Sequence, residues 1–319
     1  AESAASINQI NKNIESIKNQ FVVLDSAIDQ ASEALEDIGK YLETFKKETE
    51  TQTRSMENAG EELNLAIGQV ISGVVVNDKN GETIEYTNIG ILGKNIGTVS
   101  DSQGKFSIDI NSQFNNDSLL FSSIGYFPKQ VKVSEFRNGN VKVALKEKVY
   151  EIKPVVVTPR IFKPKTLGVS TRSKMASAGF ENNLLGYEMG IIMKVKKTAK
   201  LKSVNLNFSV CSYDSLFYRL NIYKVTGPLA FENILENPIY LSLTKNDVKE
   251  TVRIDLEKYN LVMQGYFLVT IEHVKDLGDG RLYFCAGLKE KTYYRKTSQG
   301  EWKTAPVGIS ISVDADVEK

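Results

Sequence analysis

Residues 7–45 carry an unbroken 3-4 spacing of apolar side chains, which predicts a long helix that ends near residue 67. No proline interrupts this pattern. The register continues more weakly through Thr49, Gln52, Met56, Ala59, Leu63 and Ala66. The seam positions a and d of its heptads are Ile7, Ile10, Ile14, Ile17, Phe21, Leu24, Ile28, Ala31, Leu35, Ile38, Leu42 and Phe45.

A helix with one apolar stripe needs partner helices, because a lone rod of about 90 Å leaves that stripe in water. Isoleucine at both a and d favours three or four strands, and small or uncharged residues at e and g also suit a wide bundle. We therefore expect a homotrimer, with docking on the helix of a different protein as the alternative. An intramolecular hairpin is less favoured, since no Gly/Pro turn divides the repeat.

From Gln69 the hydrophobic period changes from 3.5 to 2, which predicts β-strands. About seven short strands with turn signals between them indicate a β-sandwich over residues 69–148. In its centre, Asp101 and Gly104 are expected to close a turn, because aspartate bonds downstream amides and glycine tolerates positive φ. The expected strands lie in 70–76, 83–92, 93–108, 118–123, 130–133 and 141–145.

Residues 149–166 contain prolines spaced by five and are expected to form a stiff, extended linker. Residues 167–319 are β-rich again, and their strand count favours a second, jelly-roll-like sandwich. The fold class is therefore mainly β with a long N-terminal helix. The eight strands expected there are 187–195, 203–210, 217–223, 239–243, 250–255, 265–273, 282–286 and 307–313.

The net charge of +1 hides an asymmetry between the two ends of the chain. Residues 1–66 hold 13 acidic and 6 basic side chains, whereas 67–319 hold 26 and 34. Because the whole chain is nearly neutral, no global field favours nucleic acid or an anionic membrane. No apolar run approaches the roughly 20 residues that cross a bilayer. The opening segment is polar, so an exported form of this protein would be a mature chain.

Several blocks in 69–148 resemble the carboxypeptidase-regulatory-like domain. The resemblance implies a transthyretin-like, seven-stranded sandwich in an exported protein of Bacteroidetes type, here followed by an uncharacterised β-rich region. It also implies an accessory module without catalysis, at the cell surface, associated with the outer membrane, or in the periplasm. The blocks are Ile71–Val75, Glu85–Ile91, Gly97–Asp101, Gly104–Phe106 and Ser123–Tyr126.

His273 is the only histidine. The zinc site of a metallocarboxypeptidase needs two histidines and a glutamate, and that of a zincin needs two histidines on one helix, so neither site can be assembled. A structural role in a strand is the simpler interpretation of this residue, and we expect no enzyme, no metal and no cofactor. Cys211 and Cys285 are too few for a disulfide scaffold. They are expected to be buried free thiols, with a single bridge between neighbouring strands as the alternative.

Two polar clusters have ordinary structural interpretations. The segment Asp276–Gly280 is typical of a hairpin turn and lacks the ligand spacing of a calcium loop. The basic run is typical of a solvated, protected sheet edge rather than a nucleic-acid site. It consists of Lys194, Lys196, Lys197, Lys200 and Lys202.

Tyr293, Tyr294 and Trp302 flank a turn near the C-terminus and are the candidate binding residues. Exposed aromatic rings can stack on sugars, although core packing or aromatic pairing across strands is the simpler explanation. The sequence therefore predicts a non-enzymatic, exported interaction protein, which is multimerised or docked on a partner through its helix. The alternative is a carbohydrate-binding accessory protein of a glycan-uptake system.

Overall fold

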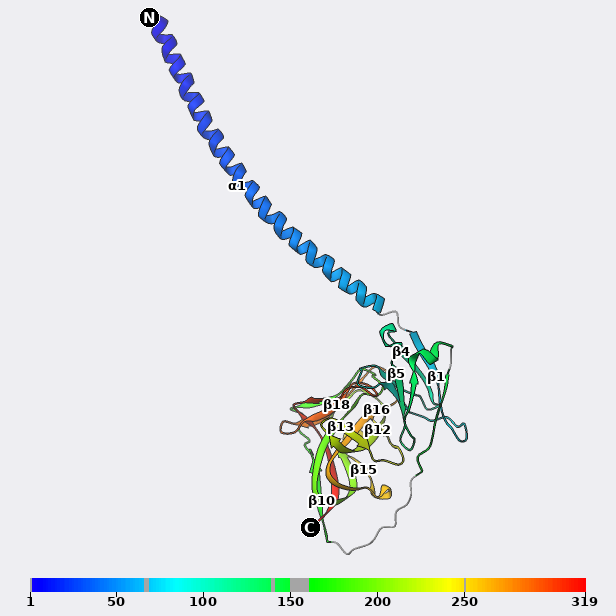
Figure 1. Cartoon of the computed structure of the whole chain (residues 1–319). Helices are drawn as coiled ribbons and strands as arrows, with labels where there is room; N and C mark the ends of the chain where they lie inside the picture. The colour runs from blue at the N-terminus through cyan, green and yellow to red at the C-terminus, as the bar shows by residue number, and fades with distance from the viewer. Residues whose placement is uncertain (1, 66–68, 139–140, 150–160, 250) are drawn as a thin grey trace. The chain divides into compact units, whose positions relative to one another are not determined.

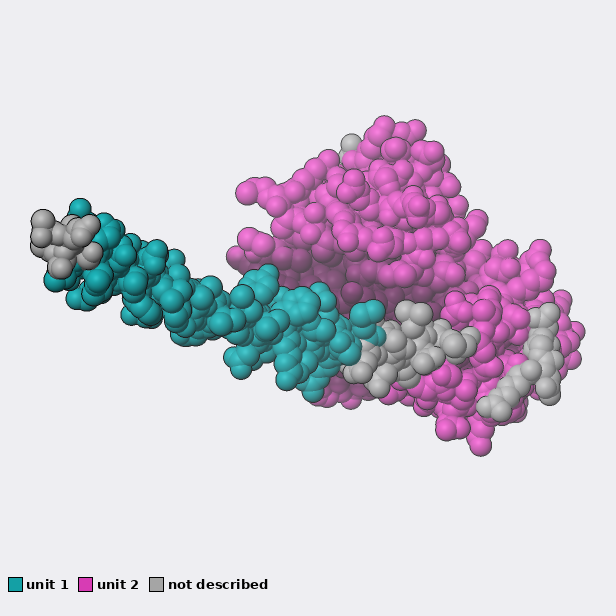
Figure 2. All heavy atoms as spheres, turned by 90° about the horizontal axis from the view of Figure 1, so that it is seen from above, with its two compact units in different colours: residues 1–67 teal, residues 68–319 magenta. Residues whose placement is uncertain are grey.

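The computed structural model describes residues 2–65, 69–138, 141–149, 161–249 and 251–319. The chain divides into two compact units, residues 1–67 and 68–319. The space-filling view in Figure 2 colours the first unit teal and the second magenta.

The first unit is a single helix, α1 (Glu2–Leu65), which Figure 1 shows as one continuous and gently curved rod. This confirms the prediction of a long helix. The predicted seam stays open along it, since Ile14 is 46% exposed and Leu35 is 67% exposed. Near its C-terminal third, threonine hydroxyls bond carbonyls four residues earlier, which bends a helix slightly. None of the described helices is long and apolar enough to span a membrane.

The second unit begins with seven strands in two sheets, ordered β4-β1-β7 and β3-β2-β5-β6. Apolar side chains from both sheets, such as Ile71, Phe106 and Phe121, form one buried core between them. The predicted turn is present, because Asp101 Oδ1 accepts the amides of Gln103 and Lys105 at 2.8 Å and Gly104 has φ +71°. The strands are β1 (Gln69–Asn77), β2 (Asn88–Ile91), β3 (Gly97–Val99), β4 (Lys105–Ile110), β5 (Ser118–Ser122), β6 (Lys129–Lys132) and β7 (Val141–Leu145).

The rest of the unit contains a ten-stranded sheet, whose main path is β13-β12-β16-β10-β18-β19, and a four-stranded sheet of β9, β11, β17 and β20. Side chains of both sheets meet in the largest core, which includes Phe180, Phe267 and Phe284. The strands are β8 (Phe162–Gly168), β9 (Ser177–Glu181), β10 (Glu188–Leu206), β11 (Phe208–Cys211), β12 (Ser215–Gly227), β13 (Ala230–Asn233), β14 (Ile239–Thr244), β15 (Val252–Asp255), β16 (Val262–His273), β17 (Arg281–Gly287), β18 (Thr292–Arg295), β19 (Lys303–Ala305), β20 (Gly308–Ile309) and β21 (Ile311–Glu318). Short 3-10 helices are η1 (Ser112–Phe114), η2 (Val133–Asn138), η3 (Asp247–Lys249) and η4 (Glu257–Tyr259).

This region differs from the eight strands expected for it. Within the described residues it has fourteen strands. The single strand β10, whose register shifts along its length, contains most of the residues of the two strands expected at 187–195 and 203–210. The missed strands are short or rich in lysine and threonine, so their period-2 pattern is weak. Strand β8 also includes the end of the expected linker, of which residues 150–160 lie outside the described part.

The seven-stranded part and the larger sheets belong to one compact unit. Tyr86 and Val99 of the first part share a small core with Val274, and Phe217 and Tyr240 pack against it. Tyr86 contacts the last two rings at centroid distances of 5.1 and 5.2 Å. The two β-rich parts therefore pack against each other through these side chains.

Candidate functional site

Four charged side chains form a row across one face of the ten-stranded sheet. Arg219 on β12 is the cross-strand neighbour of Glu272 on β16. Glu272 is also the neighbour of Glu188 on β10, and Glu188 is the neighbour of Arg295 on β18. Direct cross-strand neighbours point to the same face of a sheet, so the strand register creates this row. All four are buried, and neither carboxylate has any exposed surface.

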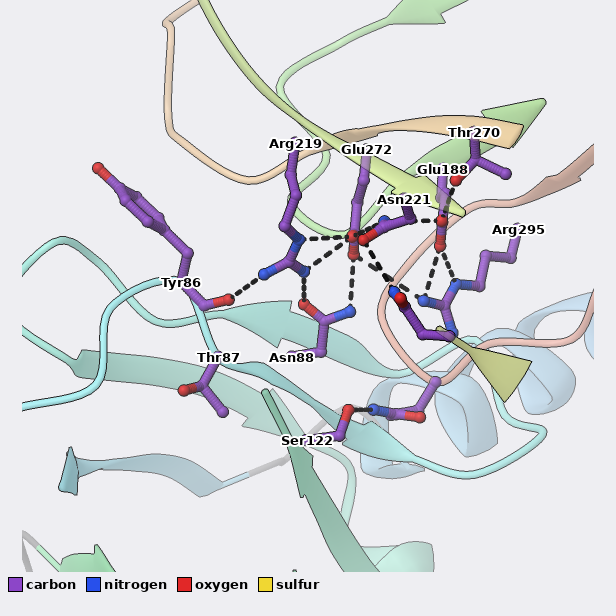
Figure 3. A network of polar contacts seen from close by, with 12 residues as sticks. Tyr86, Thr87, Asn88, Ser122, Glu188, Arg219, Asn221, Thr270, Glu272 and Arg295 are labelled. Carbon is purple, nitrogen blue, oxygen red and sulfur yellow. Dashed lines mark hydrogen bonds and ion pairs between the residues drawn. The ribbon is translucent and has the colours of Figure 1, made fainter. Parts of the chain in front are cut away.

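Each arginine holds one carboxylate by two donors, as Figure 3 shows. Nε and Nη2 of Arg219 lie 3.1 and 2.7 Å from Oε2 of Glu272. Nε and Nη2 of Arg295 lie 2.9 and 2.7 Å from Oε2 of Glu188. Paired donors of this kind combine charge with fixed geometry, which suits a buried ion pair.

Neutral side chains satisfy the remaining acceptors of the two carboxylates. Asn221 Nδ2 donates to Glu188 at 2.9 Å and to Glu272 at 2.7 Å. The hydroxyls of Tyr223, at 2.8 Å, and of Thr270 donate to Glu188 Oε1. A fully satisfied network of this kind avoids the large cost of an unpaired buried charge.

The two carboxyl groups differ in protonation equilibrium because they differ in cationic neighbours. Burial raises the pKa of Glu188, and Arg295 opposes that rise only in part. Burial would also raise the pKa of Glu272, but Arg219 and Arg295 together outweigh it and hold that pKa below its usual value. The asymmetry resembles that of an acid–base pair. However, with no exposed surface on either group, the pair offers no face to a substrate.

The network continues into the seven-stranded part. Arg219 Nη1 donates to the carbonyl of Tyr86 at 2.7 Å, and its Nη2 donates to Oδ1 of Asn88. Asn88 Nδ2 in turn donates to Glu272 Oε1 at 2.7 Å. The amide of Asn88 therefore bridges both partners of one ion pair, so the row of charges holds the two β-rich parts together.

A second contact lies next to the network, where the loop after β18 meets strands β2, β3 and β5. The Gly93 amide donates to the Gln299 carbonyl at 2.9 Å, and Gln299 Nε2 donates to Ser122 Oγ at 2.7 Å. A Cβ on Gly97 would lie only 2.1 Å from the carbonyl oxygen of Ser298. Glycine is therefore required here for close backbone approach.

The sequence predicted the strands that carry Asn88, Glu188, Arg219 and Glu272, but it predicted neither strand β18, which carries Arg295, nor the side chains of the network. Polar residues alternate with apolar ones in β12, as in Arg219 and Asn221 beside Leu220 and Ile222, which was the available signal. That alternation normally marks a solvated face. Only the tertiary structure shows that the seven-stranded part covers it.

The three predicted aromatic binding residues do not form one surface. Tyr294 packs with the main core, whereas Tyr293 lies on the opposite face of β18, as strand alternation requires. Tyr293 and Trp302 are brought together around Phe231, at centroid distances of 6.2 and 5.0 Å. The guanidinium carbon of Arg295 lies 5.1 Å from the Trp302 ring. These half-buried rings are thus built onto the end of the charged row.

His273 points to the other face of β16, into the main core. Its ring lies 5.2 Å from that of Tyr218 and 6.2 Å from that of Phe180, and it is fully buried. Neither ring nitrogen has a hydrogen-bond partner among the described residues. This environment agrees with a structural histidine, and its burial lowers the pKa of the imidazole.

We expect His273 to make the folded protein sensitive to mild acid. Its pKa is near 6.5 when unfolded and lower when folded, so its neutral form favours folding above pH 6.5. That contribution is lost as the pH falls through 6.5 towards the folded pKa. In urea titrations, the free energy of unfolding of the wild type should therefore fall more between neutral and acid pH than that of His273→Phe. Parallel curves for the two proteins would contradict this expectation.

The two cysteines and Asp276 have local structural roles. Cys211 and Cys285 are free thiols, as expected, but only Cys285 is buried, whereas Cys211 is half-buried. Asp276 Oδ1 accepts the amide of Gly278 at 2.9 Å, which is the hydrogen bond of a turn and lowers the pKa of Asp276. No three histidine, cysteine or acidic side chains lie close enough to hold a metal ion in the part of the chain that the structure describes.

The basic run is mostly exposed on β10, with local partners for several members. Lys194 lies over the ring of Tyr266 at 4.5 Å, and Lys202 pairs with Glu257 at 2.7 Å. Two members of the run, Lys200 and Lys202, also line a groove at this end of the sheet.

Residues 71–157 match the CarboxypepD_reg-like domain. The chain therefore carries a domain of this family between its N-terminal helix and its β-rich C-terminal region, which confirms the resemblance seen in the sequence. The matched segment contains Tyr86 and Asn88, the two residues through which this domain joins the charged row.

Two solved structures are remotely similar to this chain. A Bacteroides fragilis protein, described as membrane-associated and of unknown function, covers 79% of this chain and 98% of its own, at 13% identity and a TM-score of 0.20. A structure of infectious bursal disease virus covers 79% of this chain and 62% of its own, at 8% identity and a TM-score of 0.18. Similarities at this level carry no functional argument. Comparison with curated proteins gave no match.

Proposed function

We propose that this chain is a non-enzymatic, exported interaction protein, which its N-terminal helix multimerises or docks on a partner and whose β-rich unit is presented for binding. The observation that supports it best is the open seam of α1. Eleven large apolar side chains on this seam are each 46–67% exposed. Burying such a stripe is the main source of stability for a long helix, so a partner helix is required.

A homotrimer is the favoured assembly. Isoleucine occupies both a and d positions in the first heptads, which disfavours two-stranded packing. Three linked copies would present three β-rich units, and weak contacts by each would add through a high effective concentration. Docking on a helix of another protein is the alternative assembly.

The CarboxypepD_reg-like domain supports the proposal that the protein is exported. The same domain, together with the inaccessible carboxylates of Glu188 and Glu272, supports the proposal that the protein is not an enzyme. The proposal also includes the finer fold classes, a transthyretin-like sandwich over 69–148 and a jelly-roll-like region over 167–319. An experimental structure of the full chain would test these classes directly.

Light scattering on the purified full chain tests the central proposal. A trimer has three times the 35.6 kDa chain mass. A monomeric full chain would overturn multivalent display by self-assembly and would leave docking on another helical protein. Fractionation of the native host would test export, since recovery in the cytoplasm alone would contradict it.

A carbohydrate-binding accessory role is the second candidate, and the cluster of Phe231, Tyr293 and Trp302 favours it. Half-buried rings held in place by Arg295 are pre-organised for stacking. We expect Trp302→Ala to abolish any glycan-array binding by the full chain. The control Phe127→Ala, at an exposed ring of the seven-stranded part, should leave it unchanged. An array without any bound glycan would remove this candidate.

A further inference from the structure

A groove of about 1530 Å³ lies at one end of the ten-stranded sheet. Its walls are β10 at residues 200–202, the segment 234–237 after β13, and residues 257–265, which include η4 and the start of β16; Lys224 adds to the rim. The volume exceeds the roughly 300–1,000 Å³ typical of small-ligand pockets. An extended ligand therefore fits this groove better than a compact one.

The floor of the groove is aliphatic. Buried Leu201, Leu235 and Met263 belong to the main core, and half-buried Leu261 packs against that core. Val262 remains 55% exposed in the same lining. The apolar surface available to a partner is therefore mainly that of Val262 and half-buried Leu261, because Leu201, Leu235 and Met263 are at most 5% exposed.

The rim of the groove is cationic. It contains four lysines, and two glutamates oppose them. Glu257 is already engaged by Lys202 at 2.7 Å. Among the described residues Lys224 and Lys258 form no salt bridge, and the amine of Lys258 lies 5.0 Å from the ring centroid of Tyr259. The four lysines are Lys200, Lys202, Lys224 and Lys258, and the glutamates are Glu236 and Glu257.

We propose that this groove binds a short acidic peptide segment of a partner protein that inserts aliphatic side chains onto the floor. Positive charge around an apolar centre selects a ligand with the opposite charge and matching apolar anchors. A flat anionic bilayer does not enter a concave groove. Sugar rings stack on aromatic faces, and only Tyr259 provides one in this lining.

The test uses the full chain and two short fluorescent peptides, one alternating glutamate with leucine and the other alternating lysine with leucine. The acidic peptide should bind and the basic one should not, and added salt should weaken binding. Lys224→Glu with Lys258→Glu should weaken binding at least about tenfold. Val262→Asp should weaken it as well, and both variants alter exposed side chains, so the fold is expected to persist.

The matched control reverses two exposed lysines of the seven-stranded part, Lys105→Glu and Lys142→Glu, and should bind like the wild type. Equal binding of both peptides, equal loss in the control, or binding only to vesicles of anionic lipid would overturn the proposal. The inference adds a partner to the proposed function but does not require a trimer. A helix-seam variant that becomes monomeric should still bind the acidic peptide, so failures of the two proposals are distinguishable.

Discussion

Glu272→Ala is expected to lower the free energy of unfolding of the β-rich unit by about 3–5 kcal/mol, the usual effect of leaving a buried charge unpaired. Arg219 would keep only the Tyr86 carbonyl and the Asn88 amide oxygen as partners. Against a typical total stability of about 5–15 kcal/mol, this is a large loss. Glu272→Gln keeps the shape and several hydrogen bonds, so its effect should be smaller.

Urea unfolding followed by fluorescence measures this loss, with Glu257→Ala as the matched control. Glu257 also pairs with a basic residue, Lys202, but its side chain is 58% exposed and water screens the pair. The control should therefore unfold almost like the wild type. If Glu272→Ala unfolded no more easily than Glu257→Ala, the buried row would not hold the unit together as described.

The second large effect concerns the helix seam. Replacing Ile14 and Ile28 with aspartate places charges at two a positions, and three such charges per layer would be buried in a trimer. We expect the mass from light scattering to fall from that of a trimer to that of a single chain. Helix content by circular dichroism should fall as well, because an isolated helix without its packing is marginal in water.

The control for the seam places aspartate at Val22 and Val23. These residues are 68% and 69% exposed, more than any of the eleven large apolar seam residues between Ile7 and Phe45, but they lie at b and c positions. The control should therefore retain the mass of the wild type. Equal loss of mass in both variants would show that general hydrophobicity of the helix, rather than its seam, drives assembly.

Much of the secondary structure was predictable from patterns between residues that are close in the sequence. The 3-4 spacing from Ile7 to Phe45 predicted the helix because helical neighbours lie three and four residues apart. Strands β4 and β5 of the seven-stranded part were predicted from the alternation of apolar and polar side chains that is visible within each of them. The turn at Asp101 was correct because it depends on two side chains within four residues of each other.

The charged row was beyond such reasoning. Arg219 and Glu272 are 53 residues apart, and Asn88 and Glu272 are 184 apart. Nothing within β12 or β16 reveals that another part of the chain covers their polar face. A buried charge and a solvated charge have the same local pattern, and only the long-range packing distinguishes them.

The contact of Phe231 with Tyr293 and Trp302 was not predictable from the sequence for a related reason. Tyr293 and Tyr294 are adjacent in the sequence, but adjacent strand residues point to opposite faces. Phe231 comes from β13, which reaches Tyr293 and Trp302 only through the arrangement of the strands in the sheet.

By itself, the sequence determined the helix with its apolar seam, the β-rich character of the remainder, and the CarboxypepD_reg-like domain. Each of these depends on periodicity or motifs within a few residues. Only the tertiary structure decided that Glu188 and Glu272 are buried between arginines, that Asn88 joins this row, and that lysines surround an aliphatic groove. These features depend on strand register and on contacts between distant segments, because burial and charge pairing are properties of packed surfaces rather than of local sequence.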